Sequence, residues 1–164
     1  MFVKTVLVTG ANRGIGLEFV RQFLSAPTPP EHLIATYRDP NTSHDLLELA
    51  KTESSLHAIQ LDVTNSKAFP DLVSQLEKLV GNSGLNLLIN NAGFKESELR
   101  DLDSVTEELM VKHFKVNCVA PLLLTRWEQA NVKTKGFLRN NSFQSSTASP
   151  EKCSKLGVEQ SYGS

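Results

Sequence analysis

The sequence predicts a doubly wound α/β domain with a parallel sheet, and three observations support this fold class. Short apolar runs alternate with segments whose apolar residues recur at helical spacing throughout residues 1–126. The apolar runs are nearly continuous, as in strands that are buried on both faces. A glycine-rich turn joins the first run to the first helical segment. This alternation implies right-handed crossovers and the strand order 3-2-1-4, in a Rossmann-like sheet that is incomplete on its C-terminal side.

Four strands and four helices are expected along this stretch. The first helix ends at the proline-rich segment 26–30, and Ser43 is the expected N-cap of the second. Gly81 to Gly84 turns the chain after the third helix. The expected strands are 2–8, 32–37, 56–61 and 85–90, and the expected helices are 15–25, a segment from Ser43 through Ala50, 66–80 and 104–126.

Length and composition set limits on the class of protein. The chain has 164 residues, 40% of them apolar and 21% charged, as in one soluble globular domain. A net charge of −1 offers no field for nucleic acid or an anionic membrane. Cys118 and Cys153 lack metal or disulfide spacing, which favours a reducing, cytoplasmic location. We expect no signal peptide, membrane span or metal site.

The glycine turn, TGANRGIG at residues 9–16, carries the strongest chemical signal. A turn between a strand and a helix at this spacing holds a pyrophosphate, because the N–H groups of the first helical turn point at the anion. The alternative is that Gly10, Gly14 and Gly16 serve packing alone. Binding of ATP or GTP through a Walker A loop is excluded, because Gly16 is followed by Leu17 and not by lysine.

The end of the second strand indicates which dinucleotide is preferred. Arg38 follows this strand, and Arg13 lies inside the glycine turn. Two arginines that converge on a 2′-phosphate favour NADP (NADPH) and disfavour NAD. Asp39 complicates this interpretation, since it could neutralise Arg38. Two solvated surface arginines remain the alternative.

Two further strand ends and one helix contribute candidates. Asp62 could accept a bond from an adenine amino group, or could cap the next turn with its side chain. The NNAG segment at 90–93 lies across the crevice from the glycine turn. Pro121 removes the helical partner of the Asn117 carbonyl, so we expect a kink there and a backbone oxygen open to water or a ligand. His113 is expected to be a helix-face residue without a catalytic role.

The pattern of apolar residues changes from Trp127 onward. Residues 127–164 show no sustained period and are expected to be an irregular or disordered tail, apart from a weak strand at 136–139. Residues 85–90 would then form an exposed edge strand. The long helix would expose leucine and phenylalanine side chains.

Taken together, TGANRGIG, Asp62-Val63, NNAG and KVNCVAPLLLT resemble the short-chain dehydrogenase/reductase family over residues 1–126. Within it, the prolines before the second strand and TYRDP after it look most like the sniffer-type carbonyl reductases. The resemblance implies NADPH-dependent reduction of small-molecule carbonyl compounds. It assigns Thr9 to tie the glycine turn to NNAG, and Asn117 to hold a water as the family's catalytic asparagine. The cofactor contacts that it implies are Gly10, Asn12, Arg13, Gly14, Ile15, Gly16, Arg38, Asp62, Val63, Asn90, Ala92 and Gly93.

One departure from the family pattern bears on activity. The family's acid is a tyrosine four residues ahead of a lysine, but neither Tyr37 nor Tyr162 has a lysine at that spacing. Ser142, Ser145 or Ser146 could be the remnant of the family's serine strand. The pattern stops after Arg126, as in a truncated isoform. A catalytically silent dinucleotide-binding or interaction module, paired with itself or with full-length relatives, is therefore the alternative to an active oxidoreductase.

Overall fold

The protein is described from a computed structural model, which covers residues 3–96, 102–131 and 134–140. A parallel sheet of five strands runs through its centre in the order β3-β2-β1-β4-β5. The strands are β1 (Thr5–Val8), β2 (His32–Tyr37), β3 (Leu56–Gln60), β4 (Leu85–Asn90) and β5 (Thr134–Asn140). The predicted order 3-2-1-4 is confirmed for the first four strands.

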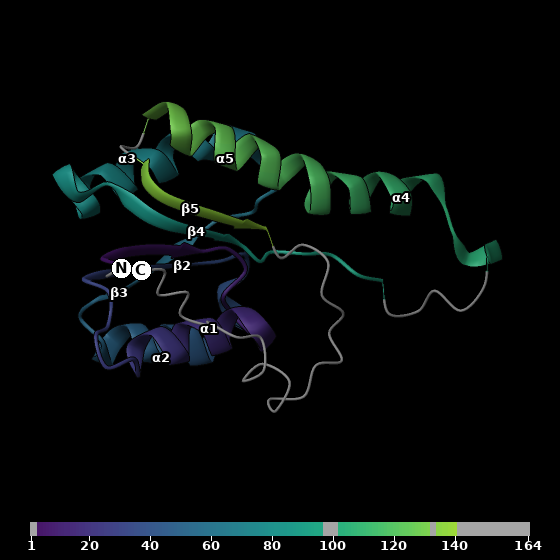
Figure 1. Cartoon of the computed structure of the whole chain (residues 1–164). Helices are drawn as coiled ribbons and strands as arrows, with labels where there is room; N and C mark the ends of the chain where they lie inside the picture. The colour runs from purple at the N-terminus through teal and green to yellow at the C-terminus, as the bar shows by residue number, and fades with distance from the viewer. Residues whose placement is uncertain (1–2, 97–101, 132–133, 141–164) are drawn as a thin grey trace, which may run out of the picture.

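Helices cover both faces of the sheet, so the molecule has three layers (Figure 1). α1 (Gly14–Leu24) and α2 (His44–Thr52) lie on one face. α3 (Phe69–Val80) and α5 (Ala120–Asn131) lie on the other, while α4 (Glu107–Phe114) continues the line of α5 beyond the sheet. None of the helices in the described ranges is long and apolar enough to cross a bilayer.

Each face of the sheet has its own apolar core. Leu7, Ile34 and Leu88 pack with α3 and with Leu124 of α5. Val6, Val8 and Leu33 alternate with them and pack with Leu17 and Val20 of α1 and with Leu46 of α2. Successive residues of a strand point to opposite faces, so strands covered on both sides are apolar at nearly every position. This explains the continuous apolar runs of the sequence.

The expected long helix at 104–126 is wrong in detail. The structure has a 3₁₀ turn at Leu102–Ser104, then α4, a π-helical segment at Lys115–Val119, and α5. In the π segment the Ala120 N–H bonds to the Lys115 carbonyl, five residues back. The expected break around Asn117 thus takes the form of a π-bulge, which suits a helix where Pro121 cannot supply the normal donor.

The segment that follows also differs from expectation. α5 extends to Asn131, and β5 pairs with β4 in parallel, with Leu87 opposite Phe137 and Ile89 opposite Arg139. The expectation of irregular chain is therefore wrong for 127–131, and so is that of β4 as an edge, whereas the weak strand expected at 136–139 is confirmed as part of β5. The pairing is long-range and leaves no local period to detect. The rest of the tail, with Ser142, Ser145, Ser146, Cys153 and Tyr162, lies outside the described residues.

Ser43 takes the expected N-cap position of α2 without the expected bond. Its hydroxyl donates to the Asp39 carbonyl at 2.6 Å and makes no cap bond to α2. The Asp39 carboxylate accepts instead from the Asn41 N–H at 2.9 Å and begins a 3₁₀ turn at Pro40–Thr42. These two bonds hold the short connection between β2 and α2 in place before the helix begins.

Candidate dinucleotide-binding site

The glycine turn lies between the end of β1 and the start of α1, at the carboxyl edge of the sheet. Gly10 and Gly14 have φ values of 63° and 56°, a left-handed conformation that favours glycine. Arg13 is the N-cap of α1, but its side chain makes no cap bond, and the first turn of α1 contains no acidic residue. The N-terminal N–H groups of α1 are therefore left without the usual side-chain cap, as an anion site requires.

Gly16 is required by close packing within the turn. A Cβ atom at this position would lie less than 3.0 Å from the Gly10 carbonyl oxygen, the Asn91 Nδ2 and the Ala11 Cα. Gly10 faces Ala92 in the same way, since an added Cβ would lie 2.8 Å from the Ala92 Cα. These contacts bring the start of α1 and the NNAG segment against the turn.

Thr9 ties the turn to the strand end across the crevice, as the family resemblance implies. Its hydroxyl oxygen accepts from the backbone N–H groups of Asn91 and Ala92, both at 3.0 Å. The Asn91 side-chain amide donates back to the carbonyls of Thr9 and Gly10 at 2.9 and 3.0 Å. Asn91 was missing from the predicted cofactor contacts, and its role here is to shape the turn.

β2 supports the turn from its other side. The Gly10 N–H donates to the Thr36 hydroxyl at 3.3 Å, and the Ala11 N–H donates to the Thr36 carbonyl at 2.7 Å. Asn12 donates from its side chain to the Thr42 carbonyl at 3.2 Å. Asn12 thus links the turn to the β2–α2 connection. Thr36 was not among the predicted site residues, because in the sequence it is only one more residue of a strand.

The two predicted phosphate ligands are free to bind. Arg13 and Arg38 are both exposed, and neither takes part in an ion pair of the described residues. The concern that Asp39 neutralises Arg38 is not met, because the Asp39 carboxylate caps its own turn. Arg38 follows β2 and Arg13 follows β1, and these strands are neighbours in the sheet. The residues present therefore fit an anionic dinucleotide.

Asp62, which follows β3, makes the capping bonds that were one of its two alternatives. Its Oδ1 accepts from the Thr64 N–H at 2.9 Å and from the Thr64 hydroxyl at 2.7 Å. The side chain is nevertheless exposed. Val63 beside it is half-buried and packs against the core on the α3 side. A cofactor contact of either residue remains a prediction.

The NNAG segment divides its roles between helix and turn. Asn90 is buried, and its amide nitrogen donates to the Thr125 hydroxyl of α5 at 3.2 Å. Its side chain is thus directed to α5, whereas Ala92 faces the turn and Gly93 is exposed. Ile15, on the far side of the turn, is half-buried. Contacts of Asn90, Ala92, Gly93 and Ile15 with a cofactor remain predictions.

Asn117 joins the π segment to the chain just after NNAG. Its Oδ1 accepts from the Phe94 N–H at 2.8 Å, and its Nδ2 donates to the Phe94 carbonyl at 2.9 Å. His113 lies one turn earlier, with Nδ1 3.4 Å from the Asn117 Nδ2 and its ring 4.8 Å from that of Phe94. The Asn117 side chain therefore positions the backbone next to the crevice. Its assignment as a catalytic residue remains a prediction.

Glu128 is a buried acid that sequence reasoning missed. Only 1% of the residue is exposed, and neither carboxylate oxygen has a hydrogen-bond partner among the described residues. Burial raises the pKa of Glu128 to about 8. A signal was present, because Glu128 lies four residues after Leu124 and so on the buried line of α5. No hydrogen bond links Glu128 to the described residues of the glycine turn or of NNAG, so we assign it no part in the site.

The fold and turn match known proteins. Residues 4–135 match the family model for short chain dehydrogenases. An uncharacterized oxidoreductase of Schizosaccharomyces pombe is 30% identical over 142 residues, covering 87% of this chain and 54% of the relative. The chain therefore spans about half the length of the curated relatives it matches.

Solved structures give the same result. The carbonyl reductase Sniffer of D. melanogaster superposes with a TM-score of 0.75 at 33% identity, covering 79% of this chain and 52% of that structure. An NADPH-bound carbonyl reductase from chicken fatty liver superposes with a TM-score of 0.74 at 38% identity, covering 80% and 52%. Strand order, glycine turn, family model and neighbours agree, and the chain belongs to the short-chain dehydrogenase family.

Proposed function

We propose that this chain binds NADP(H) at its glycine turn and belongs to a protein that reduces a small-molecule carbonyl compound with NADPH. The observation that carries the proposal is the pair Arg13 and Arg38, both exposed and in no ion pair with the described residues, beside a helix N-terminus without a side-chain cap. An uncapped N-terminus attracts the pyrophosphate, and arginine binds a phosphate dianion through several donors at once. The chicken-liver relative named above, solved with NADPH bound, supports the same cofactor.

Different residues of the chain would bind different parts of the cofactor. The first turn of α1 would bind the pyrophosphate, and Arg13 and Arg38 the 2′-phosphate. Asp62 would lie near the adenine, and the exposed Gly93 near the nicotinamide. When bound, the nicotinamide supplies the hydride. Asn117 would hold a water on its backbone carbonyl, while its side chain keeps the Phe94 backbone in place.

Cofactor choice can be tested by calorimetric titration with NADPH and with NADH. We expect Arg13→Ala and Arg38→Ala each to weaken NADPH binding about tenfold, because each loses a charge-assisted contact of about 1.5 kcal/mol or more. NADH binding should be nearly unchanged. Arg21→Ala is the matched control, since Arg21 is an exposed arginine of α1 that already pairs with Asp45 at 3.1 Å. Equal losses for NADPH and NADH would contradict the assignment of the arginines.

A second candidate is a module that binds the dinucleotide without turnover. The specific observation in its favour is that Tyr37, which ends β2, is followed four residues later by Asn41 and not by the lysine that the family pattern calls for. A proton donor within hydrogen-bond reach is what carbonyl reduction requires besides the hydride. NADPH oxidation with a simple quinone or aldehyde separates the two functions. Turnover that is lost in Asn117→Ala would establish the reductase, and binding without turnover would establish the module.

A further inference from the structure

Two histidines of neighbouring strands face each other at the other end of the sheet. His32 is the first residue of β2 and His57 the second residue of β3. The His32 Nδ1 and the His57 Nε2 are 3.3 Å apart, with ring centroids at 5.5 Å. Both side chains are half-buried. Nothing in the proposed cofactor site uses them, because that site lies where the strands end and this pair where they begin.

The paired strands fix the backbone positions of both histidines before any ligand arrives. The His32 N–H donates to the Lys4 carbonyl at 3.0 Å, and His57 is in register with Ile34, two residues along β2 from His32. The two side chains therefore lie diagonally on one face of the sheet, the face that α3 covers. Such a pair on paired strands loses little freedom when it binds, because the sheet has already ordered it.

We propose that His32 and His57 together bind a divalent transition-metal ion, with zinc as the reference ion. Zinc–nitrogen bonds measure about 2.0–2.1 Å, and two nitrogens at a tetrahedral angle are then about 3.3–3.4 Å apart. The observed 3.3 Å matches this separation. Imidazole nitrogen is a ligand that zinc, copper and nickel all accept.

The protonation of the pair suits the ion. Two neutral rings that face each other keep one N–H between the facing nitrogens. Metal binding needs both facing nitrogens without hydrogen. The shared hydrogen moves to the outer nitrogen of its own ring, so neutral rings take up the ion without a net loss of protons.

Water would complete the coordination. Within the described ranges, no group of three or more histidine, cysteine, aspartate and glutamate side chains is arranged to hold a metal. His57 borders a cavity of about 800 Å³ that is open to solvent along the edge strand β3 and is also lined by Gln75, Lys78 and Leu79. Water can therefore reach the ring. The ion would be exchangeable and would clamp the edge strand β3 to β2.

The test uses the whole chain and zinc chloride alone, with binding measured by calorimetry and stability by the thermal midpoint. We expect one zinc per chain and a rise in Tm of roughly 5 °C when zinc is in large excess over its Kd. His32→Asn and His57→Gln should each abolish most of the rise. His44→Gln is the control, since His44 is an exposed histidine that lines the same cavity.

Three results would overturn the proposal. A zinc-induced rise that survives in His57→Gln would place the ion elsewhere. A loss of the rise in His44→Gln as well would indicate an adventitious ion only. Absence of any zinc binding to the folded wild-type chain, verified by circular dichroism, would leave the two rings as a simple hydrogen-bonded pair. NADPH titration of the same samples keeps this outcome separate from that of the proposed cofactor site.

Discussion

The glycine turn and the helical arm, residues 107–131, contrast in how their polar groups are satisfied. At the turn, the Thr9 hydroxyl, the Asn91 amide and the Thr36 hydroxyl each bond to a neighbouring segment. In the arm, the His113 Nε2 and both Glu128 oxygens are buried without partners, and the described residues hold no other such side-chain atom. The buried polar side-chain atoms that lack partners thus lie in the arm and not at the turn, although Asn117 and Thr125 of the arm are hydrogen-bonded.

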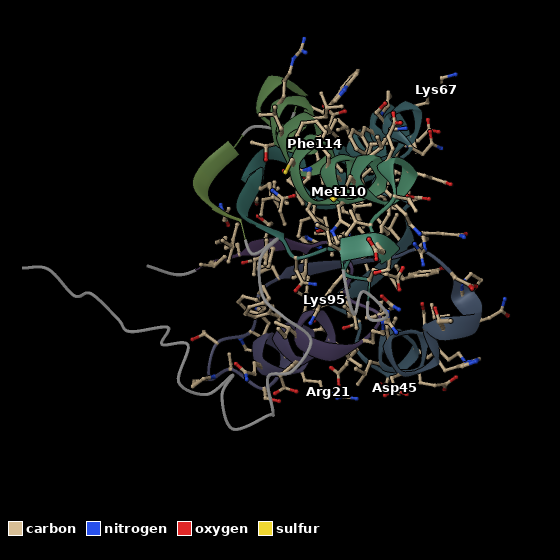
Figure 2. All side chains as sticks on the ribbon, turned by 90° about the vertical axis from the view of Figure 1, so that its right-hand side faces the viewer. Arg21, Asp45, Lys67, Lys95, Met110 and Phe114 are labelled. Atoms are coloured by element: carbon tan, nitrogen blue, oxygen red, sulfur yellow. The ribbon has the colours of Figure 1, made fainter. Side chains whose placement is uncertain are left out.

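The apolar residues repeat the contrast. Val6, Leu7 and Val8 before the turn are fully buried. On the arm, Met110, Phe114 and Leu122 are 54%, 62% and 69% exposed, and the first two are labelled in Figure 2. Arg21 and Asp45, labelled in the same figure on α1 and α2, form an ordinary surface ion pair. The apolar residues before the turn are thus fully covered by the sheet and its helices. The outer face of the arm has no apolar partner in the described residues.

The largest expected effect breaks the turn itself. Gly16→Ala should cost about 3 kcal/mol or more, because the new Cβ meets backbone atoms that cannot move aside. Unfolding in denaturant measures the loss. Gly14→Ala is the matched control: nothing lies within 4 Å of its added Cβ, so only the φ of 56° opposes it, at about 1–2 kcal/mol. Equal losses would show that the close approach at Gly16 is not the constraint.

A nearly equal change of opposite sign is expected in the arm. Glu128 has a folded-state pKa of about 8 against 4.5 when unfolded, so folding binds a proton. The loss of folding stability that the buried carboxyl causes is absent below about pH 4.5, grows as the pH rises, and is complete above about pH 8. At about 1.4 kcal/mol per pKa unit, Glu128→Leu should stabilise the protein by about 3 kcal/mol at pH 7.

Thermal or denaturant unfolding from pH 4.5 to pH 8 checks this sign. The stability difference between Glu128→Leu and the wild type should widen as the pH rises. Glu128→Gln, which keeps the shape, should share the flat pH profile with a smaller gain, since its amide stays unpartnered. A constant difference across this range would mean that the carboxyl is not buried in its acid form.

A smaller loss of stability should follow from removing the Thr9 hydroxyl, which links the glycine turn to the NNAG segment. Thr9→Val keeps the shape but leaves the Ala92 N–H without its acceptor, at about 2 kcal/mol, whereas the Asn91 N–H keeps the Ile89 carbonyl at 2.9 Å. Thr9→Ser should restore most of the stability. Thr42→Val is the comparison, because the exposed Thr42 hydroxyl makes one bond, to the Asp39 carbonyl at 3.2 Å. We expect its effect on unfolding and on NADPH binding to be slight.

The smallest effect should come from the outer face of the arm. Leu122→Gln should change stability by about 0.5 kcal/mol or less, because the side chain is already mostly in water. Leu124→Ala, two residues on but only 1% exposed, should cost about 2–5 kcal/mol. Denaturation midpoints of the two variants test whether only the inner face of α5 contributes to the core. Similar losses would show that Leu122 is buried in solution.

Local patterns predicted the parts of the fold whose signals lie within a few residues. β2 and β4 were predicted at their observed bounds, and α1 within one residue, because strand texture and helical spacing are local. Features with weak local signals were predicted in part or not at all. β5 was predicted only as a weak strand at 136–139, because it depends on pairing with β4 across a crossover. The Ser43 bond to Asp39 was not predicted, and the break around Asn117 was predicted as a kink and not as a π-bulge.

The sequence by itself determined the sheet of alternating strands and helices, the glycine turn and the arginines beside it. These follow from periodicity, from the steric freedom of glycine and from residue chemistry, all of which act over short stretches of chain. Four features are visible only in the folded chain: Asp39 caps its own turn and does not pair with Arg38, Asn91 and Thr36 shape the turn, His32 faces His57, and Glu128 is buried with no partner among the described residues. The physical reason is that hydrogen-bond partners and burial depend on which distant segments the folded sheet brings together.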